Sequence, residues 1–598
     1  MAARSTQVIL VNDTGFVLSL TGSGLSHGEW SSGAEPPATV ASNAKVSWQS
    51  ESDGIATGTE GTADFAVVST GASLHFHWDN PFVGSNSYDE KSPVGLTLER
   101  SGGGGDNATV TWILGQTAGF WGQLRSQPPA PLGPCWLLTD GRVFAKQDGS
   151  ANCWILTPDV TGDYSNGSWK PASSMTGDRR YFASAVLANG KLLVCGGEYY
   201  NGAQVNTNLC EIYDPVADSW ATVAPPATPP GRRGGRATPW PAIGDGSSVV
   251  LANGKFLLGN INTTAYATFD PATQAFTVSP NAKASPCDEE SWVLMPDGNV
   301  LTIETNSPPN TESYDPATDT WSATGTTGPS VIAPGAEIGP GLALPDGRGL
   351  IAGGSGTLAF AATGANPAWT LGASFPPDEN GLPHQPKDAP ACLLPSGQVL
   401  FAVAPNDQGS SGFPAGVKFF LFDPSPVAYD PLGSPWLSVP SDSLPTAGSA
   451  FNLATLMLPT GQVLLTFSQD PGQVALYTPA GTPEPSWRPV IDKMPRRVKT
   501  GATMQISGRQ FNGLSQCSVY GDDVAVATNY PVARVLLRNG KIRYLRTHDH
   551  STMGIATGAQ EVTTNVDIPA DLPRGRMTLQ IVANGIGSTG TPLNVVKG

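Results

Sequence analysis

The sequence is poor in charged side chains, in cysteine motifs and in long apolar runs. Charged residues make up 14% of the 598 residues, and no long stretch has the apolar spacing of an amphipathic helix. The seven cysteines are scattered, odd in number and without a C-x-x-C pair, which argues against a disulfide scaffold or a structural zinc site. No apolar run approaches the ~18 residues of a transmembrane helix. These absences favour a protein built from short strands.

The N-terminus lacks the core of a signal peptide. Its first apolar run, VILV (8–11), ends at Asn12 and Asp13 and is too short for such a core. The sequence therefore predicts synthesis in the cytoplasm without a signal peptide. If the protein acts at a target membrane, we expect it to be released through an inclusion body, by lysis or by a non-standard secretion route.

The net charge of −16 is unevenly distributed. Residues 1–118 carry −8, whereas residues 491–598 carry +6. Nucleic-acid binding requires a basic footprint, so we expect no nucleic-acid partner. Anionic lipid would repel the acidic N-terminal segment. Membrane binding would therefore depend on aromatic side chains or on a neutral or zwitterionic headgroup.

Glycine and proline are abundant, and they separate short apolar runs. An apolar run, a turn that ends in glycine and a second apolar run occur seven times, as in LLTDGRVFAK (137–146) and LMPDGNVLTIE (294–304). Asp-Gly and Asn-Gly between apolar runs are strong hairpin signals. The turn glycines are Gly141, Gly190, Gly254, Gly298, Gly347, Gly397 and Gly461.

The spacing of these hairpins predicts a seven-bladed β-propeller. The turn glycines are 44 to 64 residues apart, close to the ~50 residues of a kelch-type blade. Most hairpins precede a third strand and a fourth that carries an aromatic residue, and we expect these aromatic residues to pack between blades. They are Trp220, Phe276, Trp321 and Trp487.

The remaining segments are also predicted to form β-structure, so the expected fold is all-β. We expect a β-sandwich over residues 1–118, a Pro/Gly-rich linker over 119–134 and the propeller over 135–490. The alternating segment MTLQIVANG (577–585) predicts an immunoglobulin-like sandwich over 491–598.

A kelch propeller followed by an immunoglobulin-like domain resembles the galactose oxidase and glyoxal oxidase family of copper radical oxidases, over roughly residues 130–598. RRYFASAVLANGKLLVCGG (179–197) resembles the blade that carries the family's cross-linked tyrosine, and Tyr181 falls at its place, nine residues before the turn glycine. The resemblance implies copper-dependent oxidation of an alcohol, aldehyde or sugar.

The other positions depart from the oxidase pattern. Leu132 stands where the family has its cysteine, and Phe451 and Asn452 stand where it has its axial tyrosine and first histidine. The second histidine of the family comes from the C-terminal domain, where His548 and His550 are available. Copper needs several nitrogen or oxygen ligands. We therefore expect no catalytic residue and no bound cofactor; Tyr181 and His550 would be the remnant of an oxidase site.

The same register places acidic residues around one mouth of the propeller. Asp245, Glu289 and Asp388 lie nine residues before their turn glycines, and Glu337 lies ten before. Converging charges must be solvated, paired or bound to a cation. The alternatives are a water-filled mouth with basic partners such as Arg180 and Lys387, or a site for a divalent cation, an amine or a sugar.

Residues 1–118 resemble the aegerolysin family, and most closely its small insecticidal crystal proteins of bacilli. The matching segments, in the family's order, are HGEW (27–30), GTEGT (58–62), WDNPFVGSNSYD (78–89) and the Gly-rich turn of GGGGDNATVTWIL (102–114). The resemblance implies a compact antiparallel β-sandwich of bacterial origin that recognises membrane lipid, often sphingolipid. It also implies that a separate pore-forming partner protein can be required.

Four aromatic residues are candidates for lipid contact, because amphipathic rings suit the membrane interface. They are Trp30, Trp78, Phe82 and Tyr88. The alternative for each of them is packing in the core of the sandwich.

Together these features predict a toxin-like, membrane-targeting protein, with insecticidal activity as one form of that role. The N-terminal domain would bind lipid, and a catalytically inactive propeller would bind a second ligand such as a glycan or a partner protein. A copper radical oxidase with an attached lipid-targeting domain is one alternative. A structural or adhesion module is another.

Overall fold

The protein is all-β, as predicted. The computed structural model describes the chain except for residues 1–3, 15–16, 42–43, 69–72, 93–95, 117, 231–235, 365–366, 407–411, 425–434, 442, 470–472 and 521–525. Its described residues form β-strands and two short 3₁₀ helices, η2 (Ala450–Asn452) and η3 (Pro485–Trp487). Within that part of the chain no helix is long and apolar enough to cross a membrane.

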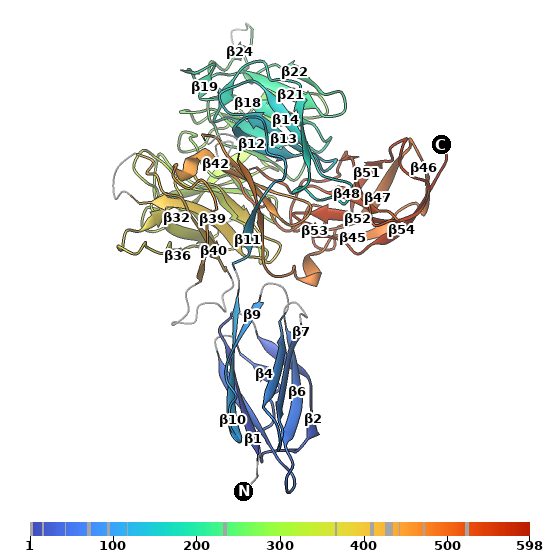
Figure 1. The fold of residues 1–598 in the computed structure, drawn as a ribbon. Coiled ribbons are helices and arrows are strands. Elements are labelled where there is room, and N and C mark those ends of the chain that lie inside the picture. The colour runs from blue at the N-terminus through green and yellow to red at the C-terminus, as the bar shows by residue number, and fades with distance from the viewer. Residues whose placement is uncertain are drawn as a thin grey trace. The chain divides into compact units, whose positions relative to one another are not determined.

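The chain divides into two compact units (Figure 1). The first comprises Met1–Phe120, Asp423–Leu437 and Pro479–Ser486, and the second comprises the rest. Each unit has its own buried hydrophobic cluster, so each is described by itself.

The N-terminal unit is a sandwich of two five-stranded sheets (Figure 1). Buried and less buried residues alternate along its strands, and the aromatic side chains of Trp48, Phe76 and Trp112 fill the space between the sheets. The first sheet has the order β3 (Glu29–Trp30), β5 (Lys45–Glu51), β1 (Ser5–Asn12), β10 (Asn107–Gln116), β9 (Leu96–Gly102). The second has the order β4 (Thr39–Val40), β2 (Leu18–His27), β6 (Thr59–Val67), β7 (Ser73–Asn80), β8 (Ser87–Lys91).

Seven small antiparallel sheets form the propeller. Every predicted hairpin is present, and its turn glycine has a positive φ, as at Gly190 (80°) and Gly298 (89°). The blades are given from the inner strand outward. Blade one is β12 (Leu132–Leu137), β13 (Val143–Gln147), β14 (Cys153–Thr157), β15 (Ser168–Ala172), and blade two is β17 (Ala183–Val186), β18 (Leu192–Cys195), β21 (Cys210–Asp214), β22 (Ser219–Val223). Blade three is β25 (Ser248–Val250), β26 (Phe256–Gly259), β27 (Tyr266–Asp270), β28 (Ala275–Val278), and blade four is β29 (Val293–Leu294), β30 (Val300–Ile303), β31 (Asn310–Asp315), β32 (Thr320–Thr326).

The last three blades continue the same pattern. Blade five is β33 (Gly341–Ala343), β34 (Gly349–Ala352), β35 (Thr357–Ala361), β36 (Trp369–Ser374). Blade six contains β38 (Ala391–Leu393), β39 (Val399–Pro405) and β40 (Lys418–Phe422), and β37 (His384–Gln385) also pairs with β39. Blade seven has β42 (Leu453–Met457), β43 (Val463–Phe467) and β44 (Val474–Thr478). The inner strand β42 contacts β12, which closes the ring.

The outer strand of blade seven comes from the segment predicted to be a linker. Strand β11 (Phe120–Gln123) pairs with β44, although it precedes blade one in the chain. Trp121 of β11 packs on Tyr477 and Phe419, with ring centroids 5.0 and 4.8 Å apart. The expectation that Trp487 lies on this fourth strand is therefore wrong: Trp487 ends helix η3 and lies against the turn glycine Gly397.

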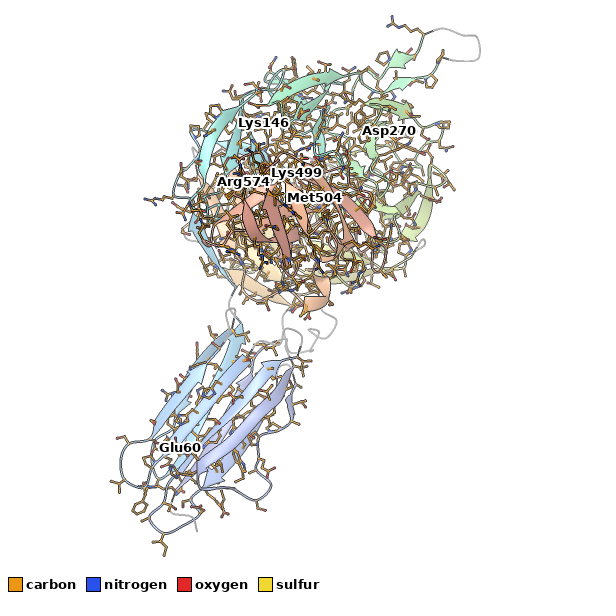
Figure 2. All side chains as sticks on the ribbon, turned by 90° about the vertical axis from the view of Figure 1, so that its right-hand side faces the viewer. Glu60, Lys146, Asp270, Lys499, Met504 and Arg574 are labelled. Carbon is orange, nitrogen blue, oxygen red and sulfur yellow. The ribbon has the colours of Figure 1, made fainter. Side chains whose placement is uncertain are left out.

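The C-terminal domain is a two-sheet sandwich with its own core (Figure 1). One sheet has the order β45 (Val490–Lys493), β47 (Thr503–Arg509), β51 (Val562–Asp567), β50 (Thr547–His548). The other has the order β46 (Arg497–Lys499), β54 (Thr591–Val596), β52 (Gly575–Ala583), β48 (Val532–Leu536), β49 (Ile542–Leu545). Figure 2 shows Lys499 and Met504 on this domain. The alternating segment 577–585 becomes part of the long strand β52 and the turn after it.

A segment between β47 and β48 enters the propeller ring. We call residues 515–520 the channel segment. Gln516 accepts a hydrogen bond from the backbone N–H of Leu294, the carbonyl of Cys517 accepts one from Leu393, and Val519 forms a bridge with Gly341. The segment therefore runs along the inner strands of blades four, five and six, and it is buried along its whole length.

Candidate functional site in the propeller mouth

Three of the predicted carboxylates meet at one point of the propeller mouth. Each of Glu289, Glu337 and Asp388 offers an oxygen, and these oxygens all lie within 4.8 Å of one another. The three residues precede the inner strands of blades four, five and six, so the predicted register brings them together as expected. Asp388 has a φ of 48°, which is uncommon for a residue other than glycine.

The fourth predicted carboxylate lies beside this group. Asp245 precedes the inner strand of blade three, is 5% exposed, and interacts with the Glu289 carboxyl group. One of its oxygens, Oδ1, is buried without a hydrogen-bond partner among the described residues. We call Asp245, Glu289, Glu337 and Asp388 the acidic cluster.

Tyr520 of the channel segment completes this site, and sequence reasoning missed it. Its hydroxyl donates a hydrogen bond to Oδ1 of Asp388 and lies 3.3 Å from Oε2 of Glu289. Tyr520 is 132 residues from Asp388 in the chain, and no repeat or motif in the sequence links the two. Only the threading of the channel segment through the ring places the phenol there.

The two nearby cations have other partners. Lys387 donates a hydrogen bond to the carbonyl oxygen of Gly412, and its ammonium lies 4.4 Å from the ring centroid of Phe413. Arg180 pairs with Asp148 at 3.1 Å. These contacts are not ion pairs with the acidic cluster, which was one of the two alternatives, but the positive charge of Lys387 still offsets part of the rise that burial causes in the pKa of Glu337 and of Asp388.

Burial opposes ionisation of the cluster. Burial and the adjacent Asp388 raise the pKa of Glu337 to about 9. Burial also raises the pKa of Asp388 to about 6, against hydrogen bonds that favour its charged form. The pKa of Asp245 is raised by burial as well. Near neutral pH the cluster is thus stable only when it holds protons or a compensating positive charge.

The oxidase-like positions form a separate small cavity. Tyr181, Phe451 and Asn452 line one cavity of about 30 Å³ together with Arg180, so the register prediction for these three residues is right. Phe451 packs on Phe413, with centroids 4.7 Å apart, and it offers no ligand atom. Leu132 is buried in the core.

The residual pair Tyr181 and His550 is not brought together, which corrects the prediction. Tyr181 precedes the inner strand of blade two, whereas the backbone N–H of His550 bonds Ala188 beyond the other end of that strand. Nδ1 of His550 lies 2.8 Å from the hydroxyl of Thr564, and burial with the nearby His548 lowers the pKa of His550 to about 3. The residues around Tyr181 therefore do not fit a copper centre.

The predicted lipid contacts divide between core and surface. Trp78 is fully buried and donates a hydrogen bond from Nε1 to Ser50, so its prediction as a lipid contact is wrong. Trp30 packs on Trp78 at 5.9 Å. Tyr88 is partly buried, with its hydroxyl bonded to the Gly103 carbonyl at 2.8 Å. Of the four, Phe82 is the exposed side chain.

Phe82 belongs to an apolar surface at one end of the N-terminal sandwich. Ile55 is 99% exposed, Val83 is 85% exposed and Phe82 is 40% exposed. Their loops leave the same end of the sheet, because β6 begins and β7 ends at the paired residues Thr59 and Asn80. We call Ile55, Phe82 and Val83 the apolar tip; Figure 2 shows the adjacent Glu60 on this unit.

A basic residue lies beside the apolar tip. Arg4 donates a hydrogen bond to the carbonyl of Phe82 at 2.6 Å, and its guanidinium lies 5.5 Å from the Phe82 ring centroid. Sequence reasoning missed Ile55 and Val83. The available signal was that Ile55 stands in the loop SDGIATG (52–58) and that Val83 follows Phe82 in the loop NPFVGSN (80–86), both rich in residues typical of turns.

Comparison with models of protein families finds a match to one blade of the propeller. Residues 179–227 match the kelch motif. They include the inner hairpin and the two outer strands of blade two. The kelch character of the propeller, predicted from hairpin spacing, is confirmed. No curated protein matches the chain.

Solved structures with a similar fold are distant. A novel fungal alcohol oxidase in complex with copper is 14% identical, covering 80% of this chain and 100% of that one with a TM-score of 0.44. The structure of YjhT is 14% identical, covering 59% and 95% with a TM-score of 0.34. The lipid-binding protein Nakanori is 11% identical, covering 19% and 73% with a TM-score of 0.18. These likenesses are too low to carry an argument about activity.

Proposed function

We propose that this protein binds membranes through the apolar tip of its N-terminal sandwich. The observation that supports this proposal most directly is that Ile55, Phe82 and Val83 are exposed together at one end of the N-terminal unit. Most of the other aromatic side chains of this unit are buried in its core. Single exposed apolar residues are ordinary on a protein surface, but three on adjacent loops are suited to a membrane or protein interface.

The size of the tip suits reversible binding. Complete burial of an Ile, Val or Phe side chain contributes ~1.5–3 kcal/mol. Three such side chains would give an anchor similar in strength to a single short acyl chain, which holds a protein at a membrane only transiently. A specific headgroup must therefore add to the binding, and the net negative charge of the segment favours a neutral or zwitterionic one such as that of a sphingolipid.

The toxin-like role belongs to the same proposal. Membrane attachment by this unit would bring the propeller, without an oxidase site, to a cell surface, where it would bind a glycan or a partner protein. The three tip side chains are too few to form a pore, so membrane damage would require a separate pore-forming partner. Insecticidal activity would be one outcome of such damage.

Vesicle co-sedimentation of the full chain tests the proposal. We expect binding to phosphatidylcholine vesicles that contain sphingomyelin and weaker binding to vesicles that contain phosphatidylserine. The double substitution Ile55→Ser/Val83→Ser should weaken binding by ~100-fold or more, because two side chains each lose ~1.5–3 kcal/mol of transfer free energy.

Val68→Ser provides the matched control. Val68 is 60% exposed and follows β6 at the end of the sheet opposite to the tip, so its substitution should leave vesicle binding unchanged. Equal binding by the tip variant and the wild type would refute the proposal. An absence of binding to every vesicle would favour the structural or adhesion alternative.

A further inference from the structure

We propose that the acidic cluster binds a hard divalent cation of the Ca²⁺ or Mn²⁺ class, which ties the channel segment to the propeller. The ligands would be carboxylate oxygens of Glu289, Glu337 and Asp388, with Asp245 as a fourth. This inference is independent of membrane binding, since it concerns the other unit of the chain.

The separation of the oxygens fits such an ion. Ca²⁺ lies ~2.3–2.6 Å from its oxygen ligands, so two ligands on opposite sides of one ion are ~4.6–5.2 Å apart and all other pairs of ligands are closer. The oxygens of Glu289, Glu337 and Asp388 lie within 4.8 Å of one another. An ion could therefore bind with only small side-chain rotations.

Asp245 supplies an independent reason to expect an ion. Its Oδ1 atom is buried and lacks a hydrogen-bond partner among the described residues, and the side chain lies beside Glu289. A buried carboxylate oxygen without a partner is costly. A cation between the four carboxyl groups would satisfy this oxygen.

The donor set selects the type of ion. The four cluster residues and Tyr520 present oxygen atoms alone, and the nearby cations Lys387 and Arg180 contact Gly412 and Asp148 instead. Oxygen ligands suit Ca²⁺, Mn²⁺ and Mg²⁺, whereas copper and zinc sites in proteins draw on imidazole or thiolate. Mg²⁺ gives up its water reluctantly and is the weakest candidate for an all-protein site.

Tyr520 gives the ion a structural role. Its hydroxyl donates a hydrogen bond to Asp388 and lies close to the Glu289 carboxylate. It would therefore fix the orientation of two carboxylate ligands without binding the ion itself. Because Tyr520 belongs to the channel segment, binding of the ion would hold that segment in the ring. The ion would stabilise the association of propeller and C-terminal domain.

Terbium luminescence on the full chain tests the site. Tb³⁺ replaces Ca²⁺ on oxygen ligands and emits when a nearby tyrosine or tryptophan is excited. We expect sensitised emission that Ca²⁺ and Mn²⁺ abolish at lower concentrations than Mg²⁺. Addition of Ca²⁺ to chelator-treated protein should also raise the Tm by several degrees, because a ligand that binds only the folded state stabilises it.

The double substitution Glu337→Gln/Asp388→Asn should abolish both responses, with at least a 100-fold loss of affinity for Ca²⁺. Its matched control is Glu35→Gln/Glu379→Gln, which removes the same charge from two exposed positions and should behave as the wild type. If the double variant does not fold, the isosteric Asp245→Asn should still weaken Ca²⁺ binding by ~10-fold or more.

Three outcomes would overturn the proposal. One is wild-type protein that neither sensitises Tb³⁺ nor gains stability with any divalent cation. Another is equal cation binding by the wild type and the cluster variant. The third is a preference for Cu²⁺ or Zn²⁺ over Ca²⁺ and Mn²⁺ at the same residues.

Discussion

Lys283 lies at the centre of a buried ionic network in blade four. Its ammonium is 2.7 Å from Glu312, 3.1 Å from Glu304 and 3.2 Å from Glu290, and its side chain is fully buried. Although burial disfavours the charged form, the surrounding carboxylates raise the pKa of Lys283. Burial and the hydrogen bond to Glu312 raise the pKa of Glu304 to about 8, which favours the protonated form of this carboxyl group.

Removal of this lysine should destabilise the propeller strongly. Lys283→Met leaves buried carboxylates without a counter-ion, which typically costs ~3–5 kcal/mol. Chemical denaturation followed by tryptophan fluorescence would measure the loss. Glu304→Gln is the control, because an amide resembles the protonated acid and should cost less than ~1 kcal/mol. A Lys283→Met variant as stable as the wild type would contradict this account of the network.

Also at the residue scale, the sequence shows which aromatic residues could contact lipid, but it does not show whether their side chains are buried or exposed. Trp30, Trp78, Phe82 and Tyr88 are all amphipathic or apolar, yet Trp78 lies in the core and Phe82 lies on the surface. Strand alternation shows that Phe76 and Trp78 share one face, and the packing of the second sheet decides that this face is internal. The aegerolysin resemblance stays a prediction.

At the scale of elements, strand β11 closes the propeller ring. It adds the outer strand of blade seven from a position before blade one, and Gln127 exchanges hydrogen bonds with Val474 of the same blade. Such closure joins the two ends of the ring through a sheet. Propeller stability should therefore depend on residues that precede the first predicted blade.

Trp121→Ala should lower the free energy of unfolding of the propeller by ~2–4 kcal/mol, because its ring fills the space between Tyr477 and Phe419. Thermal unfolding would measure the effect. Phe120→Ala is the control on the same strand, since Phe120 is exposed and its removal should be nearly neutral. Equal effects of the two substitutions would show that β11 does not contribute through this packing.

The hairpins were the most predictable elements. A two-residue turn with glycine at positive φ between apolar runs is a local signal, and all seven are present. The count of residues back from each turn also placed Tyr181, Phe451 and Asn452 in one cavity and Glu289 and Asp388 in one cluster. The fourth strand of blade seven was misplaced, because its partner is distant in the chain.

At the scale of the whole molecule, the cysteines are inert. All seven are free and buried, and burial raises the pKa of the Cys153 and Cys287 thiols to about 12. Since the thiolate is the reactive form, a thiol reagent should modify almost none of the cysteines in the folded protein and seven in denaturant. Reductant should leave the Tm unchanged. Fewer than seven thiols in denaturant would reveal a disulfide and contradict this prediction.

The sequence by itself determined the all-β class, the seven hairpins and the residues that reach one end of each inner strand. These properties follow from turn chemistry and from the period of two along a strand, which act over a few residues. Tertiary structure alone decided that Tyr520 meets the acidic cluster, that β11 completes blade seven and that His550 is separated from Tyr181. Each depends on contacts between segments far apart in the chain, where local spacing carries no information about which side chains meet.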